Sequence, residues 1–153
     1  MADKERNIPG TKPRLLLHAC CAVCSSSVCL ALKDSYDITL YFYNPNIHPK
    51  LEYLKRLQAM KELSGIFSVP LAEDIYDDDR WTSLTSDTKG EPEGGKRCEA
   101  CIRIRLERTH QYAIENNFDH IGTVLSVSPH KNAQLINNIG TGICADSPAE
   151  FLR

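Results

Sequence analysis

The sequence lacks any long hydrophobic run and any strong excess of charge. Its apolar stretch at Leu15–Leu17 is far shorter than the roughly 20 residues of a membrane-spanning helix, and the charged first six residues are unlike a secretory leader. Lysine and arginine number 18 against 20 acidic residues, a net charge of -2. Nucleic-acid-binding proteins often carry a basic excess, so any surface for nucleic acid must be a local patch. We expect a cytoplasmic protein with no membrane partner.

Cysteine, by contrast, is abundant, with seven in 153 residues. Cytosolic proteins rarely use structural disulfides, and a chain of this length does not need them to build a core. The cysteines form two clusters and one isolated residue: Cys20, Cys21, Cys24 and Cys29, then Cys98 and Cys101, then Cys144. This distribution indicates metal or redox chemistry. We interpret Cys29, within a predicted helix, and the isolated Cys144 as packing residues.

The length of the chain fits one domain. Residues 1–13 are polar, contain two prolines and predict a flexible lead-in to a single domain over 14–153. Hydrophobic periodicity predicts strands at 14–18, 37–43, 67–71 and 119–127, and helices at 25–33, 49–64, 98–117 and 132–139. We expect an N-cap at Ser25 or Ser26 and a helix stop at Gly65. Strands that alternate with helices indicate an α/β domain with a parallel sheet and crossover helices.

Ligands bind such sheets beyond the carboxyl ends of the strands, and both cysteine clusters can reach that edge. Cys20, Cys21 and Cys24 follow the first predicted strand, where the dipole of the next helix would stabilise their thiolates. Cys98 and Cys101 lie three residues apart at the start of another helix, which puts both sulfurs on one side. Nearby arginines favour the thiolate form: Arg97, Arg103 and Arg105.

Five soft thiolates select zinc, copper or an iron–sulfur cluster. A structural zinc ion takes four ligands in a closed tetrahedron, and Cys20 would then be left over. An iron–sulfur centre is therefore the leading hypothesis from the residues themselves. A zinc site and a plain dithiol remain open alternatives.

Four segments carry a resemblance to a known family. Residues 15–25, LLLHACCAVCS, join a strand to a double cysteine and a third cysteine before serine, and residues 91–101, EPEGGKRCEAC, hold the second pair. The segments YNPNI at 43–47 and SPHKN at 128–132 complete the set. In this order they resemble the QueH family of epoxyqueuosine reductases over about residues 15–140. The sequence departs from the family at Val23, where proline is usual, and in lacking a C-terminal Cys-Gly-Cys motif.

The resemblance implies an adenine-nucleotide-hydrolase-like (HUP) three-layer α/β fold, with a catalytic domain over 14–153 that lacks this C-terminal motif. It implies an enzyme that reduces epoxyqueuosine to queuosine in tRNA, the last step of queuosine biosynthesis, using an unidentified electron donor. It also implies a 4Fe-4S cluster and an adjacent iron ion. By position, the metal-binding residues are Cys20, Cys21, Cys24, Cys98 and Cys101, and we expect the cluster itself on Cys20, Cys21, Cys98 and Cys101.

Epoxide opening requires a proton for the departing oxygen. The candidate catalytic residues are His18, Tyr43 and His130. For each of them the alternative is a structural residue of the core. The candidate contacts to the phosphates of tRNA are Arg97, Arg105, His130 and Lys131, for which a solvated surface is the alternative.

Three other classes of protein compete with this interpretation. An ATP-pyrophosphatase of the same fold needs a glycine-rich phosphate loop after the first strand, and residues 19–26 contain no glycine. A zinc-stabilised binding module would have no catalysis, and it predicts zinc without acid-labile sulfide. A thioredoxin-like dithiol enzyme would need no metal.

Overall fold

The computed structural model describes residues 12–76, 96–127 and 133–152, with only the backbone of 96–98 and 126–127. The described elements, in chain order, are β1 (Arg14–His18), α2 (Ala22–Leu32), β2 (Asp37–Phe42), α3 (Lys50–Phe67), β3 (Leu71–Glu73), α5 (Lys96–Glu115), β4 (His120–Thr123), the 3-10 helix η2 (Val124–Val127), α6 (Ala133–Ile143) and β5 (Glu150–Phe151). Within these residues, no helix is both long and apolar enough to cross a membrane.

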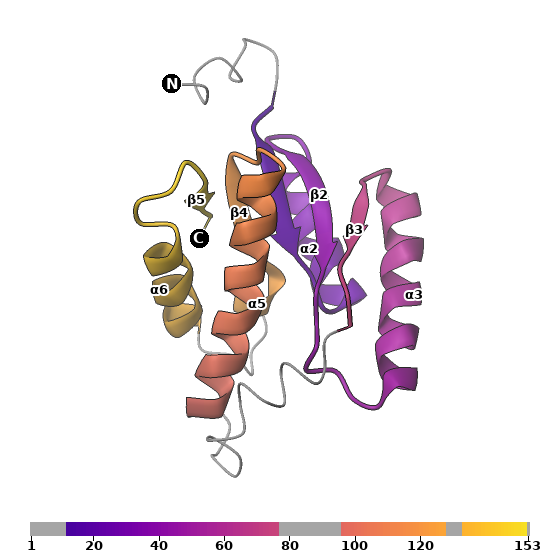
Figure 1. Cartoon of the computed structure of the whole chain (residues 1–153). Helices are drawn as coiled ribbons and strands as arrows, with labels where there is room; N and C mark the ends of the chain where they lie inside the picture. The colour runs from indigo at the N-terminus through magenta and orange to yellow at the C-terminus, as the bar shows by residue number, and fades with distance from the viewer. Residues whose placement is uncertain (1–11, 77–95, 128–132, 153) are drawn as a thin grey trace.

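The strands form one parallel sheet in the order β3-β2-β1-β4-β5. Helices lie on both faces of this sheet (Figure 1). The three-layer α/β architecture confirms the predicted fold class and is the arrangement expected of an adenine-nucleotide-hydrolase-like domain. The strand order reverses at β1, which pairs with β2 on one side and β4 on the other. The crevice at such a switch point is the usual ligand site of an open parallel sheet.

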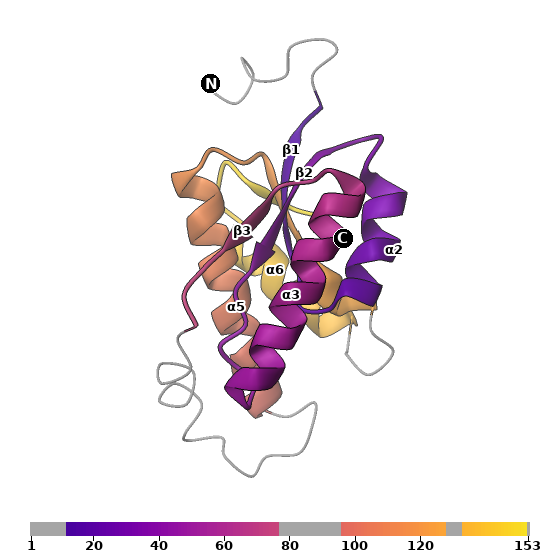
Figure 2. The same ribbon diagram turned by 90° about the vertical axis from the view of Figure 1, so that its right-hand side faces the viewer.

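The central strand β1 is buried on both faces because helices cover both. Leu15 and Leu17 point to the face that α2 and α3 cover, where they join a cluster that includes Leu57 and Met60. Leu16 points to the opposite face, where it packs in a cluster with residues of α5 and β4. Figure 2 shows α2 and α3 on one side of the sheet and α5 on the other.

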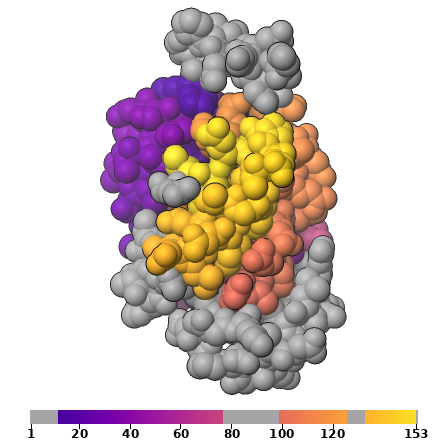
Figure 3. All heavy atoms as spheres, turned by 90° about the vertical axis from the view of Figure 1, so that its left-hand side faces the viewer, coloured from indigo at the N-terminus to yellow at the C-terminus, as the bar shows by residue number. Residues whose placement is uncertain are grey.

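The C-terminal part of the chain covers the side of the sheet formed by β4 and β5. Helix α6 packs Ile136 and Ile139 against Ile102 and Leu106 of α5. Figure 3 shows α6 and the C-terminal segment in yellow, over the middle of this face and beside α5. The short strand β5 pairs with β4. Sequence patterns missed β5, since two residues are too few to show an alternating pattern.

Several predicted boundaries were wrong. Helix α2 begins three residues before Ser25, with Cys21 as its N-cap, and the Ser25 hydroxyl instead donates to the Cys21 carbonyl at 2.7 Å. Helix α3 continues past Gly65 and ends where Ser68 adopts a left-handed conformation at φ 56°. The third strand occupies 71–73 rather than 67–71. The predicted strand at 119–127 is a strand only to Thr123, after which the chain turns into η2.

The contact between α6 and β5 gives a first prediction. A methyl group on Gly140 would lie 2.3 Å from Cε1 of Phe151, whereas one on Gly142 would meet nothing within 4 Å. Gly140→Ala should therefore lower the free energy of unfolding by about 1–3 kcal/mol through overpacking. Gly142→Ala is the matched control and should leave stability unchanged or raise it by up to about 1 kcal/mol. Urea denaturation of both variants tests this, and equal stabilities would contradict the described packing of β5 on α6.

Candidate functional site

The carboxyl edge of the sheet gathers the cysteines. β1 ends at His18, Cys20 follows two residues later, and α2 starts at Ala22. Helix α5 runs back along the sheet from this same edge, so its first turns, which include Cys101, lie near the end of β1 (Figure 1). Cys20 packs against the cluster that includes Ile102 of α5. Two segments about 80 residues apart therefore meet at the switch point.

His18 ties the strand ends together at this edge. It is fully buried, and its Nε2 lies 3.0 Å from the carbonyl of Tyr43, just after β2. A carbonyl only accepts, so Nε2 carries the proton. Nδ1 then accepts from the Thr123 hydroxyl of β4 at 3.1 Å, and the Thr123 oxygen accepts from the Leu125 N–H at 3.2 Å. Both ring nitrogens are thereby occupied.

The same environment keeps His18 neutral. Burial, with a further contribution from the positive charge of Arg105, lowers the pKa of His18 to about 3. A neutral ring whose only proton is donated to a carbonyl is poorly suited to protonate a leaving oxygen. This environment favours the structural alternative for His18 over the proton-donor hypothesis.

The backbone that leads into the cysteines is also fixed. The Ala19 N–H donates to the Tyr41 carbonyl at 2.9 Å, and the Ala19 carbonyl accepts from Nδ2 of Asn44 at 2.9 Å. Asn44 is fully buried. Cys20 therefore leaves the sheet from a rigid position.

The cysteines differ in their surroundings. Backbone N–H groups of Cys24 and Val23 and the thiol of Cys24 lower the pKa of Cys21, which makes it the most readily ionised cysteine of the first cluster. Burial raises the pKa of Cys20, although the charges of Arg105 and Arg56 oppose this effect. The pKa of Cys24 is also raised, first by burial and then by Cys21. Cys101 is 8% exposed.

A cavity of about 350 Å³ opens directly beside Cys21. Its walls come from the start of α2 and from the facing turns of α3, and the residues that line it are Cys21, Ala22, Val23, Glu52, Lys55, Arg56 and Ala59. Arg56 forms an ion pair with Glu52, with its Nε 3.0 Å from Oε1. Sequence analysis missed Lys55 and Arg56, because only the packing of α3 against α2 brings them to the cysteines.

Comparison with known proteins identifies the family. The family model described as epoxyqueuosine reductase QueH matches residues 15–153. Proteins named epoxyqueuosine reductase QueH are 42% identical over 143 residues in Staphylococcus epidermidis, 38% over 140 in Streptococcus pyogenes and 38% over 140 in Staphylococcus aureus. The alignments cover 88%, 88% and 86% of this chain and 60%, 55% and 58% of those proteins. The chain belongs to the QueH family. It spans between 55% and 60% of the length of these relatives.

The remaining residues singled out in the sequence lie partly in the core and partly outside the described residues. Tyr43 is 2% exposed and packs in the core with Leu16 and Ile121, which favours its structural alternative. Cys29 and Cys144 are buried, as their interpretation as packing residues required. Arg97 and Cys98 lie in the first turn of α5, but their side chains are outside the described residues. His130 and Lys131 also lie outside them.

The donor set of this QueH chain suits a thiolate-bound centre. Cys20, Cys21 and Cys24 lie within one loop and helix turn, and Cys101 lies in α5 next to Ile102, whose cluster Cys20 contacts. Among the side chains that the structure describes, which exclude that of Cys98, no three Cys, His, Asp or Glu groups converge closely enough to hold a metal ion. Of the five cysteines in the predicted set, Cys98 is the one whose side chain lies outside the described residues.

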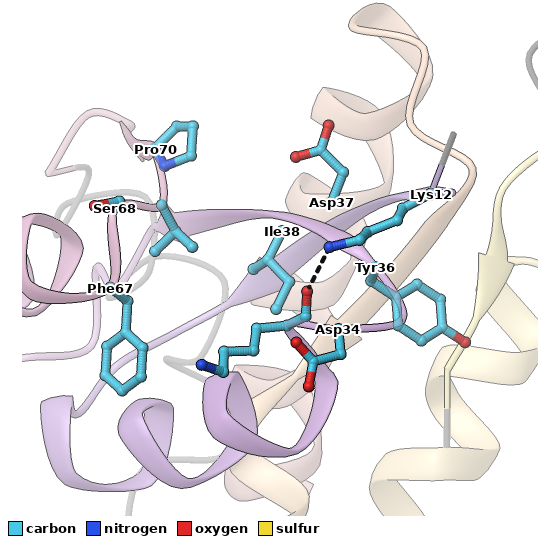
Figure 4. Close-up of a pocket in the computed structure, with 10 residues that line it drawn as sticks. Lys12, Asp34, Tyr36, Asp37, Ile38, Phe67, Ser68 and Pro70 are labelled. Atoms are coloured by element: carbon cyan, nitrogen blue, oxygen red, sulfur yellow. Dashed lines mark hydrogen bonds between the residues drawn. The ribbon is translucent and has the colours of Figure 1, made fainter. Parts of the chain in front are cut away.

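A larger cavity, of about 550 Å³, lies at the opposite, amino edge of the sheet. Figure 4 shows that Lys12, Asp34, Asp37 and Tyr36 surround it, and Lys12 donates to the Lys33 carbonyl at 3.1 Å. It contains no cysteine and opens at the end of the strands that parallel sheets rarely use for ligands. The cysteine edge is therefore the better candidate for the site.

The hydrogen bonds of His18 yield a prediction about stability. Thr123→Val keeps the shape of the side chain but leaves His18 Nδ1 and the Leu125 N–H without their partner. Leaving two buried polar groups unsatisfied should cost about 2 kcal/mol or more. Thr123→Ser retains the hydroxyl and is the matched control. Thermal denaturation should show a clearly lower midpoint for the valine variant, and equal midpoints for both variants would rule out the network.

Proposed function

We propose that this chain reduces epoxyqueuosine to queuosine in tRNA, with electrons delivered through an iron–sulfur centre held by its cysteines. The observation that carries the proposal is the convergence of both cysteine segments at the switch point of the sheet, in a chain that belongs to the QueH family. We place the reaction in the cytoplasm, where an unidentified donor resupplies the electrons. Since the relatives are longer than this chain, their complete activity is part of the proposal.

The reaction has a simple balance. Removal of the epoxide oxygen to leave a carbon–carbon double bond breaks two C–O bonds, consumes two electrons and two protons, and releases water. The electrons need a redox-active group, and a 4Fe-4S cluster would supply them one at a time when bound. The chain itself must hold the cluster, position the base and deliver protons.

The cysteines divide between two tasks in this proposal. Cys20, Cys21, Cys98 and Cys101 would hold the cluster, and Cys24, whose thiol lies in hydrogen-bond contact with Cys21, would contribute to the adjacent iron ion. The lowered pKa of Cys21 supports metal binding, because only a thiolate is a good ligand. Of the candidate proton donors, His130 lies outside the described residues and stays a prediction.

The substrate is anionic, and the cavity beside Cys21 offers cations for it. Lys55 and Arg56 line this cavity together with Glu52, the ion-pair partner of Arg56, and with apolar Val23 and Ala59. Cations of this kind position nucleic acid through its phosphates, while an apolar wall accommodates a base. Arg97, His130 and Lys131 remain the predicted additional phosphate contacts.

Metal analysis tests the proposal. The protein purified without oxygen should contain iron and acid-labile sulfide and show broad absorption in the visible range. Cys21→Ser and Cys101→Ser should each lose most of the iron, because each removes a thiolate ligand. Cys29→Ala and Cys144→Ala are controls that should retain it, since both side chains are buried in the core. Zinc without sulfide, after reconstitution with iron and sulfide, would favour the zinc-stabilised binding module and refute the proposal.

Binding of tRNA provides a second test, independent of the metal. The double variant Lys55→Gln, Arg56→Gln should bind tRNA more weakly and reduce the slope of log K against log salt by about 2, because two phosphate contacts are lost. Lys33→Gln removes a cation at the opposite edge and should change neither quantity. Affinity measured over a range of salt concentrations distinguishes the variants. An unchanged slope in the double variant would exclude this cavity as the tRNA contact.

A further inference from the structure

The guanidinium of Arg105 is buried without an acidic partner. Its residue is 3% exposed, and Nε donates to the Cys101 carbonyl one turn earlier in α5, at 3.2 Å. No carboxylate among the described residues forms an ion pair with it. The neighbouring arginines of α5 differ, since Arg103 pairs with Glu99 at the surface and Arg108 pairs with Asp74 at 2.9 Å.

Such a burial is costly. An arginine keeps its charge at any pH that a folded protein survives, and buried charges in proteins are paired or lie beside metal centres. A single carbonyl hydrogen bond does not balance a full positive charge. The position of Arg105 therefore points to a neighbouring anion other than the carboxylates of the described residues.

The surroundings of Arg105 show where this anion belongs. Its Nε binds the Cys101 carbonyl, and the neighbouring Ile102 and Leu106 of α5 belong to the cluster against which Cys20 packs. The charge of Arg105 also helps to lower the pKa of His18 and opposes the rise that burial causes in the pKa of Cys20. His18 is neutral and cannot balance the charge. Cys101, whose carbonyl Arg105 binds, and Cys20 are both proposed ligands, so the negative charge available on this side is that of the thiolates.

We propose that Arg105 is the internal counter-cation of the cysteine-held centre, a positioning residue that stabilises the bound cluster and its reduced form. This inference rests on the proposed function. Four thiolates around a 4Fe-4S cluster leave a net negative charge that grows on reduction, and a fixed cation nearby favours the more negative state. Arg105 then serves the cluster, whereas the sequence suggested a contact with the phosphates of tRNA.

The stability of the cluster-free protein distinguishes a counter-cation from an arginine that only supports the fold. If Arg105 only supports the fold, its removal should destabilise the protein with and without the cluster. If it is a counter-cation, the cluster-free protein carries an unbalanced charge that an apolar side chain of similar size removes. Arg105→Met should then leave the cluster-free protein equally stable or more stable, while weakening its hold on the cluster.

The experiment compares wild type, Arg105→Met, Arg105→Lys and the surface control Arg103→Met, each reconstituted with iron and sulfide. Arg105→Met should release iron to a chelator at least about tenfold faster than wild type and shift the reduction potential to more negative values. Arg105→Lys should recover most of both properties because it keeps the charge, and Arg103→Met should match wild type. Urea denaturation of the cluster-free proteins completes the set.

The outcomes separate the two claims. Wild-type iron release and potential in Arg105→Met, or a large loss of stability in its cluster-free form, would overturn the counter-cation role while leaving the proposed function intact. A wild-type protein that takes up no iron and sulfide would instead refute the proposed function. In that case, greater stability of cluster-free Arg105→Met would still support an unbalanced charge at this position, and lower stability would contradict it.

Discussion

The hydrogen bonds of His18 are the interaction on which the rest of the site depends. One neutral ring joins β1 to the Thr123 hydroxyl at the end of β4 and to the Tyr43 carbonyl just after β2. The three central strands therefore end at a fixed position, and the Cys20 segment leaves the sheet from that point. Protonating this ring would place a second cation beside Arg105 in the core, so the folded state favours the neutral form of His18.

In the proposed function, a fold of a type that commonly binds nucleotides would hold a metal centre instead. A phosphate loop at the switch point needs glycine, but residues 19–26 have none and supply three cysteines instead. The basic residues near the cysteines occupy two different places. Arg105 is buried on α5, where it binds the Cys101 carbonyl, while Lys55 and Arg56 line the cavity beside Cys21. In the proposed reaction, one charge faces the electron-transfer centre and two face the substrate.

Much of this arrangement could be predicted from the sequence. The hydrophobic run of β1 and the alternation of strands with helices indicated the parallel sheet, and the carboxyl-edge rule then brought both cysteine segments together. Element ends were less predictable: Ser25 is a good capping residue, but the turn of the Cys20 segment starts α2 earlier. The burial of Arg105 and the exposure of Arg56 at Cys21 depend on packing between helices, which no local pattern contains.

The central claim is that this chain, with its cysteine-held centre, removes the epoxide oxygen from the modified base. A single-turnover reaction tests it most directly: the reconstituted protein is reduced chemically without oxygen and mixed with tRNA that carries epoxyqueuosine, and the nucleosides are analysed by mass spectrometry. Our account predicts that epoxyqueuosine is converted to queuosine, with the mass loss of one oxygen atom, and that Cys101→Ser abolishes this. Unchanged epoxyqueuosine after incubation with cluster-loaded, reduced protein would contradict it.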